Sequence, residues 1–146
     1  MKMTTVYLRK TQFFVQSLSL STDEVWIFSD PCFAFPETCD DAALGSAILA
    51  ALDASRAGIP HPARDSKAHM GPLFQLAGIT SWTTFARSAK SVQVTEEGGK
   101  IAVMGNTSDG PARGFDEDPT RQVILDRNAP PSDLGLAARR LLSAVH

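Results

Sequence analysis

The feature that most constrains the fold is a pair of short alternating segments in the middle of the chain. Residues Ser91 to Thr95 alternate Val92 and Val94 with polar side chains, and Lys100 to Met104 form a second apolar run. The connection Glu96-Glu97-Gly98-Gly99 ends in two glycines, which accept the positive φ angles of a tight turn. The pattern predicts a β-hairpin, and therefore a sheet that is at least partly antiparallel.

Four further runs of aliphatic and aromatic residues predict strands: Thr4–Leu8, Phe13–Leu20, Val25–Phe28 and Arg121–Leu125. Thr11 and Gln12 are expected to connect the first two. The second run mixes apolar and hydroxyl residues, which is typical of a strand with one solvated face. After the third run, Asp30-Pro31 and Phe35-Pro36 predict an extended path rather than a helix.

Two segments predict long helices. The first is Asp40 to Ser55, with Asp40 or Asp41 as its N-cap, and the second is Ser132 to Val145, capped by Ser132. Each carries a glycine, Gly45 or Gly135, one turn after an acidic start. Glycine costs a helix about 1 kcal/mol relative to alanine, so the pair predicts close packing of each helix on the sheet or on the other helix.

The remaining segments predict irregular structure. Ile59 to Pro72 contains three prolines and is expected to be a loop, followed by a short helix over Leu73 to Ala77. Gly105 to Thr120 contains three glycines and two prolines and predicts a long surface loop. Together the elements predict a single α/β (α+β) domain over residues 1–146, with an antiparallel-rich central sheet and two main helices packed on it.

Composition excludes several classes of protein. A net charge of −2 gives no general affinity for nucleic acid, which requires a basic stripe. The start of the chain has no apolar run of signal-peptide length, and the longest apolar segment, Ala42 to Leu52, is too short to cross a membrane. Cys32 and Cys39 do not suggest a disulfide framework, so a reducing cytoplasm is expected.

The chain lacks the common catalytic motifs. There is no glycine-rich phosphate loop, no G-x-S-x-G and no C-x-x-C. Cys32 has no neighbouring histidine and is interpreted as a structural thiol. A metal at His61, His69 and His146, or at the acidic run Asp116 to Asp118, is the weaker alternative. We therefore expect no enzymatic activity, no cofactor and no metal, with a small metal-dependent enzyme as the less favoured possibility.

Charge is distributed unevenly along the chain. Between Lys10 and Arg56 there are seven acidic residues and no Lys or Arg, whereas the rest of the chain has more basic than acidic residues. Four aromatic residues also lie between Trp26 and Phe35, among these acids. Aromatic anchors surrounded by acids are typical of an interface with a cationic protein partner, since the charges steer association.

Two acidic clusters are therefore candidate contact sites. The favoured one combines acids with aromatic anchors: Asp23, Glu24, Trp26, Asp30, Phe33, Glu37, Asp40 and Asp41. The second lies in the predicted long loop: Asp109, Asp116, Glu117 and Asp118.

Several segments also carry a resemblance to a known family: the N-terminal aromatic strands, Pro31-Cys32-Phe33, Asp40 to Gly45, Ala51 to Arg56, Thr84 to Val92 and Pro131 to Gly135. In these the chain resembles the immunity proteins of bacterial contact-dependent growth inhibition systems, in particular small α/β members paired with nuclease toxins.

The resemblance implies a protein that performs no reaction. It would bind and neutralise the C-terminal nuclease domain, expected to be a tRNase, of a cognate CdiA-type toxin in the cytoplasm. It would contact neither nucleic acid nor membrane and would be a monomer outside the complex. A non-catalytic adaptor or oligomeric scaffold is the alternative, because the aromatic segment could also pair with a second copy.

Overall fold

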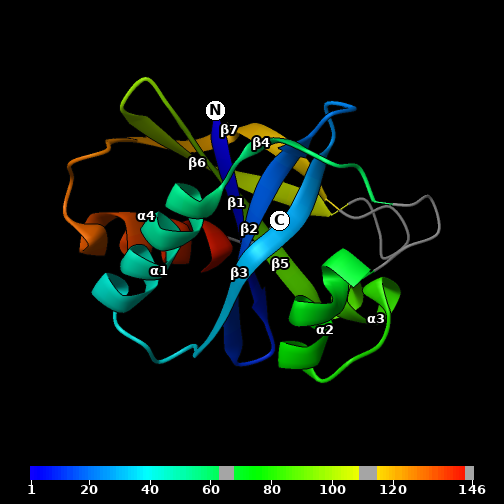
Figure 1. Cartoon of the computed structure of the whole chain (residues 1–146). Coiled ribbons are helices and arrows are strands. Elements are labelled where there is room, and N and C mark those ends of the chain that lie inside the picture. The colour runs from blue at the N-terminus through cyan, green and yellow to red at the C-terminus, as the bar shows by residue number, and fades with distance from the viewer. Residues whose placement is uncertain (63–67, 109–114, 144–146) are drawn as a thin grey trace.

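The computed structural model describes residues 1–62, 68–108 and 115–143 (Figure 1). The elements in chain order are β1 (Lys2–Arg9), β2 (Gln12–Ser21), β3 (Trp26–Pro36), α1 (Asp41–Ala54), β4 (Ala57–Ile59), a 3₁₀ turn (Ala68–Met70), α2 (Gly71–Ala77), α3 (Trp82–Ser88), β5 (Ala89–Glu97), β6 (Lys100–Ser108), β7 (Phe115–Asp126) and α4 (Pro131–Ser143).

One sheet runs through the molecule in the order β3-β2-β1-β5-β6-β7, and every neighbouring pair in this order is antiparallel. The short strand β4 adds to β2 in parallel. The predicted hairpin is confirmed as β5–β6, with Glu97 opposite Lys100. Gly98 and Gly99 form its two-residue turn at φ angles of 60° and 78°, where a residue with a Cβ is strained. The prediction of an antiparallel-rich sheet is therefore confirmed.

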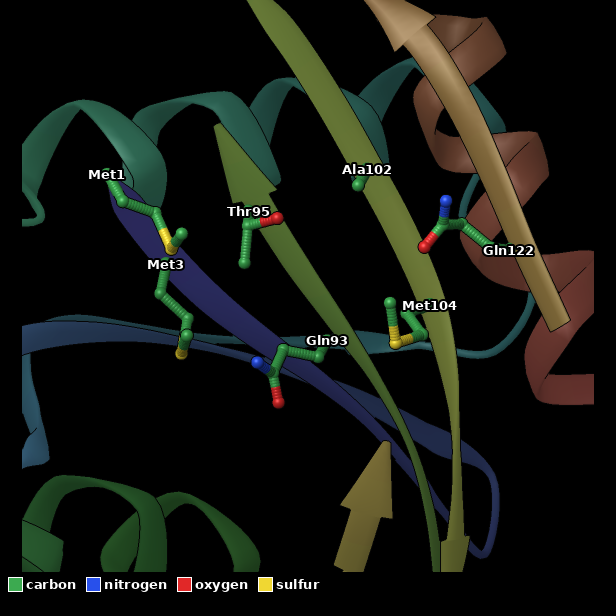
Figure 2. Close-up of a pocket in the computed structure, with 7 residues that line it drawn as sticks. All are labelled: Met1, Met3, Gln93, Thr95, Ala102, Met104 and Gln122. Atoms are coloured by element: carbon green, nitrogen blue, oxygen red, sulfur yellow. The ribbon is translucent and has the colours of Figure 1, made fainter. Parts of the chain in front are cut away.

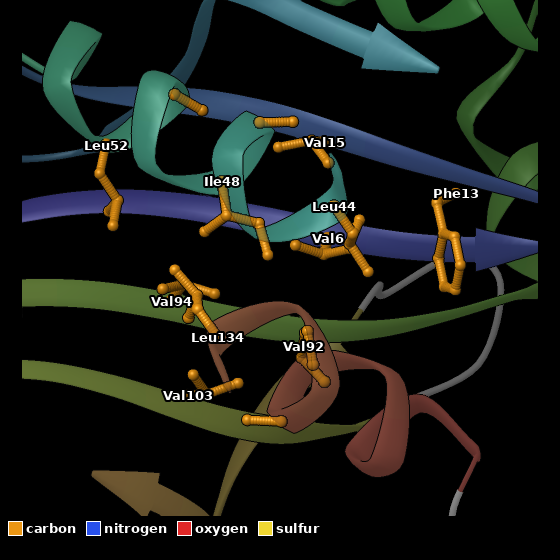
Figure 3. Packing of buried hydrophobic residues seen from close by; sticks show 14 of the residues in the cluster. Val6, Phe13, Val15, Leu44, Ile48, Leu52, Val92, Val94, Val103 and Leu134 are labelled. Atoms are coloured by element: carbon orange, nitrogen blue, oxygen red, sulfur yellow. The ribbon is translucent and has the colours of Figure 1, made fainter. Parts of the chain in front are cut away.

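Helices α1 and α4 cover one face of the sheet and enclose the main core (Figure 3). Leu44, Ile48 and Leu52 recur at helical spacing along α1 and are fully buried against the strands. Leu134 of α4 reaches the same core from the neighbouring helix. The predicted arrangement of two main helices on the sheet is confirmed, and burial of these apolar stripes holds both helices in position.

The two helical glycines lie where α1 and α4 meet. A Cβ on Gly45 would fall 1.7 Å from the carbonyl oxygen of Pro131, and one on Gly135 would fall 1.9 Å from that of Asp41. Both distances are far inside van der Waals contact, so the helix backbones touch at this point. Of the two packing reasons that the sequence left open, contact with the other helix is the correct one.

Among the described residues, the helices α2 and α3 cover one end of the opposite face of the sheet (Figure 1). A second core forms there from Tyr7, Phe14, Leu73 and Phe85, all of which are buried. Tyr7 lies edge-on to Phe85 with ring centroids 5.0 Å apart. Aromatic pairs of this geometry add stability beyond the area they bury.

The helix α3 was not predicted from the sequence, although its cap was readable. The backbone N–H of Thr84 donates to the side-chain oxygen of Ser81 at 3.2 Å, which is an N-cap contact. The segment has only seven residues, and its single fully buried large side chain, Phe85, gives no helical period. The predicted loop from Ile59 to Pro72 is also wrong at both ends, because β4 ends at Ile59 and α2 begins at Gly71.

Three predictions about the sheet are wrong, and they concern the exposure of β2, the turn after β1 and a predicted loop. Strand β2 has no solvated face, because Ser17 is buried under α1 and donates to the carbonyl of Ala51 at 2.7 Å. The turn after β1 is Lys10-Thr11 rather than Thr11-Gln12, since Gln12 already pairs with Arg9.

The third error is the long loop predicted over Gly105 to Thr120. In the part that the structure describes, β6 continues to Ser108 and β7 already begins at Phe115. Ladder pairing with a neighbouring strand outweighs the local preference of glycine and proline for turns, and a bulge near Gly105 adjusts the register.

The boundaries of the long helices differ slightly from prediction. Asp40 caps α1 as expected, and the helix ends at Ala54. Helix α4 begins at Pro131, so Ser132 lies inside it and is not the cap. Proline is favoured at the first helical position, where its missing N–H is not needed. Val145, the predicted last residue of this helix, lies outside the described residues.

Candidate functional site

Strand β3 forms one edge of the sheet. It pairs with β2 on one side, and no strand among the described residues pairs with its other side. Pro31 and Pro36 lie in this strand, and proline is tolerated at an edge because it has no N–H to donate to a neighbour. The edge therefore leaves backbone and side chains available to a partner.

Four of the predicted acidic residues follow this edge. Asp23 and Glu24 lie in the turn before β3, Asp30 lies in its middle and Glu37 follows its last residue. All four are exposed, and none forms an ion pair with a described residue. The eleven residues of β3 extend over roughly 35 Å at about 3.3 Å per residue. The carboxylates thus form an extended row, which we call the acidic edge.

Asp40 and Asp41 have structural partners instead. The backbone N–H of Ala43 donates to Oδ1 of Asp40 at 2.7 Å, which caps α1. Nε of Arg139 lies 2.7 Å from Oδ1 of Asp41 and forms an ion pair with it. The same guanidinium donates to the carbonyl of Glu37 at 2.7 Å. The charge of Asp41 is therefore offset within the chain, and Asp40 contributes to the edge only partly.

The aromatic residues of β3 are divided between the two cores. Phe33 and Phe35 pack against the main core, with ring centroids 6.3 Å apart, and Phe28 packs against the second core beside Trp82. Phe33 is thus largely used in folding. Trp26, at the start of β3, is half-buried and belongs to neither core, so it is the aromatic residue best available to a partner.

The second predicted cluster lies at the opposite edge of the sheet. Asp116, Glu117 and Asp118 are in β7, five strands away from β3 in the sheet order, and only the backbone is described for the first two. Oδ1 of Asp118 accepts from the backbone N–H of Thr120 at 3.1 Å. Asp109 lies outside the described residues. The two acidic clusters therefore cannot form one continuous surface on β3.

A hollow on the less covered face of the sheet was not predicted. It has a volume of about 290 Å³ and is shown in Figure 2. Its lining comes from β1 and the residue before it, and from β5, β6 and β7: Met1, Met3, Gln93, Thr95, Ala102, Met104 and Gln122. The alternation of Gln93 and Thr95 with buried valines was the available signal, since it shows that β5 has a polar second face. The lining has no ionisable side chain, so the hollow could accommodate a group by packing and hydrogen bonding but has no acid or base for catalysis.

The sequence offered Cys32 and the histidines as the candidate groups for catalysis or metal binding. Burial, with the nearby charge of Asp30 second, raises the pKa of the Cys32 thiol to about 12, which makes it a poor nucleophile. Burial, together with the proximity of His61, lowers the pKa of His69. Within residues 1–62, 68–108 and 115–143, no three His, Cys, Asp or Glu side chains are grouped to hold a metal ion. No helix in these ranges is long and apolar enough to span a membrane.

Comparison with known proteins gives a match to a family model and matches to solved structures. The family model described as "CDI immunity protein", where CDI denotes contact-dependent growth inhibition, matches residues 2–144. No curated protein sequence matches the chain.

Two solved structures are similar. One is a protein of unknown function, NMB0488 from Neisseria meningitidis, with a TM-score of 0.74 and 17% identity over 97% of this chain and 93% of that one. The other is a chain of a CdiA-CT/CdiI toxin and immunity complex from Yersinia pseudotuberculosis, with a TM-score of 0.74 and 15% identity over 97% and 94%. At these identities the likeness concerns the fold.

Proposed function

The chain belongs to the CDI immunity protein family, and from this membership we propose that it binds and neutralises the toxin domain of a cognate CdiA-type protein. The toxin domain is the C-terminal part of that protein and acts inside the cell, where a monomeric immunity protein meets it. The Yersinia complex of the same fold, which contains a toxin and an immunity protein, supports this proposal. The proposed activity is binding, with no reaction performed by the chain.

The acidic edge is the observation that carries the proposal about the toxin. Asp23, Glu24, Asp30 and Glu37 are exposed and free of ion pairs with described residues, and Trp26 lies among them. A nuclease, for example a tRNase, needs a basic groove for the phosphates of its substrate. A row of carboxylates competes with nucleic acid for such a groove, so we propose that the toxin is a nuclease and that β3 faces its groove.

The negative charge would also increase the rate at which such a protein associates with its toxin. Free toxin acts catalytically, so inhibition depends on rapid capture. Complementary charges raise association rates to about 10⁸ M⁻¹s⁻¹ from about 10⁵ to 10⁶ M⁻¹s⁻¹ for neutral surfaces. The carboxylates need not be buried for this effect, because steering acts before contact.

The test is a binding and protection assay with the toxin domain encoded beside this chain. The double variant Asp23→Lys/Asp30→Lys is expected to associate at least about 10-fold more slowly and to lose protection. The matched control, Glu97→Lys/Asp133→Lys, makes the same change in net charge at exposed sites away from β3 and is expected to behave like the wild type.

The outcomes separate the two parts of the proposal. Equal loss in both double variants would contradict a role for the acidic edge and indicate an effect of net charge alone. If the wild-type chain neither binds nor silences a folded, active toxin domain, the immunity function itself is wrong for this pair. A bound toxin domain that has no nuclease activity would contradict only the assignment of the toxin as a nuclease.

A further inference from the structure

Arg9, the last residue of β1, is a buried cation. Only 8% of the residue is exposed, and its Nε atom has no hydrogen-bond partner. No acidic side chain among the described residues forms an ion pair with it. Buried charges in proteins are ordinarily paired, because removal from water is unfavourable without compensation. The guanidinium therefore has no acidic partner within the part of the chain that the structure describes.

The surroundings hold the side chain in place. Arg9 lies opposite Ala89 of β5, and its Cζ is 5.9 Å from the centroid of the Phe85 ring. Phe85 is itself fully buried and is carried by α3. A guanidinium over an aromatic ring is oriented and partly desolvated, and its N–H groups can still donate to an anion. Orientation of this kind reduces the entropy lost when an anion binds.

Three exposed basic residues lie near Arg9 at this end of the sheet. Lys10 follows in the turn, and Arg87 lies in the last turn of α3, two residues before Ala89. Both side chains are exposed, and neither forms an ion pair with a described residue. Lys90 adds a further exposed charge on the opposite face, since it pairs with Leu8. An anion approaching Arg9 is therefore attracted by its neighbours as well.

This basic end adjoins the acidic edge. The backbone N–H of Glu37 donates to the carbonyl of Thr11 at 2.8 Å, which joins the turn after β1 to the segment after β3. Figure 1 shows both segments at the same end of the molecule. A protein lying along β3 would thus reach the turn that follows Arg9.

We propose that Arg9 is a recognition site for a carboxylate, an Asp or Glu side chain, that the toxin domain inserts at this end of the sheet. The proposal rests on the proposed immunity function and adds a second, opposite charge to its interface. Two contacts of opposite sign fix the direction in which a partner lies along β3, because a reversed partner would bring like charges together. Arg suits this role, since its planar fork binds a carboxylate through two parallel hydrogen bonds.

The experiment measures toxin binding and thermal unfolding of the free chain for two variants. Arg9→Met replaces the charge by an apolar side chain that still packs on Phe85, and Arg140→Met removes an exposed charge from α4 as the control. We expect Arg9→Met to bind toxin about 10- to 100-fold more weakly and Arg140→Met to bind like the wild type. We also expect the Tm of free Arg9→Met to equal or exceed that of the wild type, because an uncompensated buried charge is removed.

Two further measurements identify the anionic group that binds Arg9. Replacing each Asp and Glu of the toxin domain by Ala should reveal one position whose effect is lost in the Arg9→Met background, as a double-mutant cycle requires of a contacting pair. Inorganic phosphate, added to the free chain, should not raise the Tm of the wild type more than that of Arg9→Met. A selective rise would indicate a small-anion site and overturn the proposal.

Two results contradict the proposal directly. Binding by Arg9→Met that equals binding by Arg140→Met would show that no carboxylate is recognised there. A clear fall in the Tm of Arg9→Met would show that Arg9 acts through packing. In both cases the wild type still binds toxin, whereas failure of the wild type to bind would concern the immunity function and not Arg9.

Discussion

At the scale of single residues, Arg139 explains why a count of acids overstated the acidic surface. Its guanidinium pairs with Asp41, donates to backbone carbonyls of the segment before α1 and lies 5.0 Å from the centroid of the Phe13 ring. It comes from the other end of the chain, 98 residues after Asp41. No local pattern could reveal that Asp41 is neutralised, because the partner is brought in by the packing of α4 on α1.

Removal of Arg139 should destabilise the chain. The side chain is 26% exposed and that of Asp41 is 32% exposed, so the pair is only partly screened by water. We expect Arg139→Ala to lower the free energy of unfolding by about 2 kcal/mol, through lost charged hydrogen bonds and the stacking on Phe13. Urea denaturation measures the change, and Arg140→Ala, the exposed neighbour, should stay within about 0.5 kcal/mol of the wild type. Equal effects in the two variants would show that the Arg139 contacts contribute nothing.

At the scale of elements, the contact between α1 and α4 depends on Gly45 and Gly135. The sequence predicted that these glycines serve packing, because each weakens its own helix by about 1 kcal/mol. Only the structure identifies the neighbour, the backbone of the other helix. The same contact brings Arg139 over the start of α1, so the charge pattern at the end of the acidic edge depends on how two helices approach each other.

Alanine at Gly45 should destabilise the fold although it favours the helix. Its Cβ would lie 1.7 Å from the carbonyl oxygen of Pro131, and relief of this overlap requires the helices to separate. Overpacking of this kind costs about 1 to 3 kcal/mol, which exceeds the gain in helix propensity. Thermal and urea unfolding measure the loss, with Ser46→Ala, on the exposed side of α1, as the control. A more stable Gly45→Ala variant would contradict the close contact.

Across the whole molecule, the acidic residues of the two predicted clusters lie at opposite edges of the sheet. Four exposed carboxylates without an ion pair to a described residue follow β3. Asp53, which also belongs to the acidic stretch of the sequence, instead pairs with Arg127 at 2.9 Å. Asp116 to Asp118 lie on the opposite edge in β7. A partner therefore meets one extended row of negative charge with a basic end beside it, rather than a uniformly acidic protein.

Such a distribution predicts a strong dependence of association on salt. We expect the association rate with the toxin domain to fall steeply as ionic strength rises, because the Debye length is about 10 Å at 0.1 M and about 3 Å at 1 M. The dependence should be weaker for Asp23→Lys/Asp30→Lys, since part of the steering charge is reversed. Stopped-flow mixing at several salt concentrations measures it. A rate that does not change with salt would contradict electrostatic steering.

The sequence by itself determined the features that depend on local pattern. The hairpin β5–β6, the strands β1 and β2, both long helices and the cap of α1 by Asp40 follow from periodicity, turn glycines and capping residues, which act over a few residues. Its resemblance to CDI immunity proteins is confirmed by the family model over residues 2–144. The contact residues named from the sequence stay a proposal.

Only the tertiary structure decided which of the predicted contact residues are available. Phe33 packs against the main core, and Asp41 pairs with Arg139. Asp116 lies at the far edge of the sheet, in a strand where the glycines and prolines of the segment had predicted a loop. It also left Arg9 buried and without an ion pair to any residue that the structure describes. These outcomes depend on side chains from distant parts of the sequence meeting in space, and on ladder hydrogen bonds outweighing local preference.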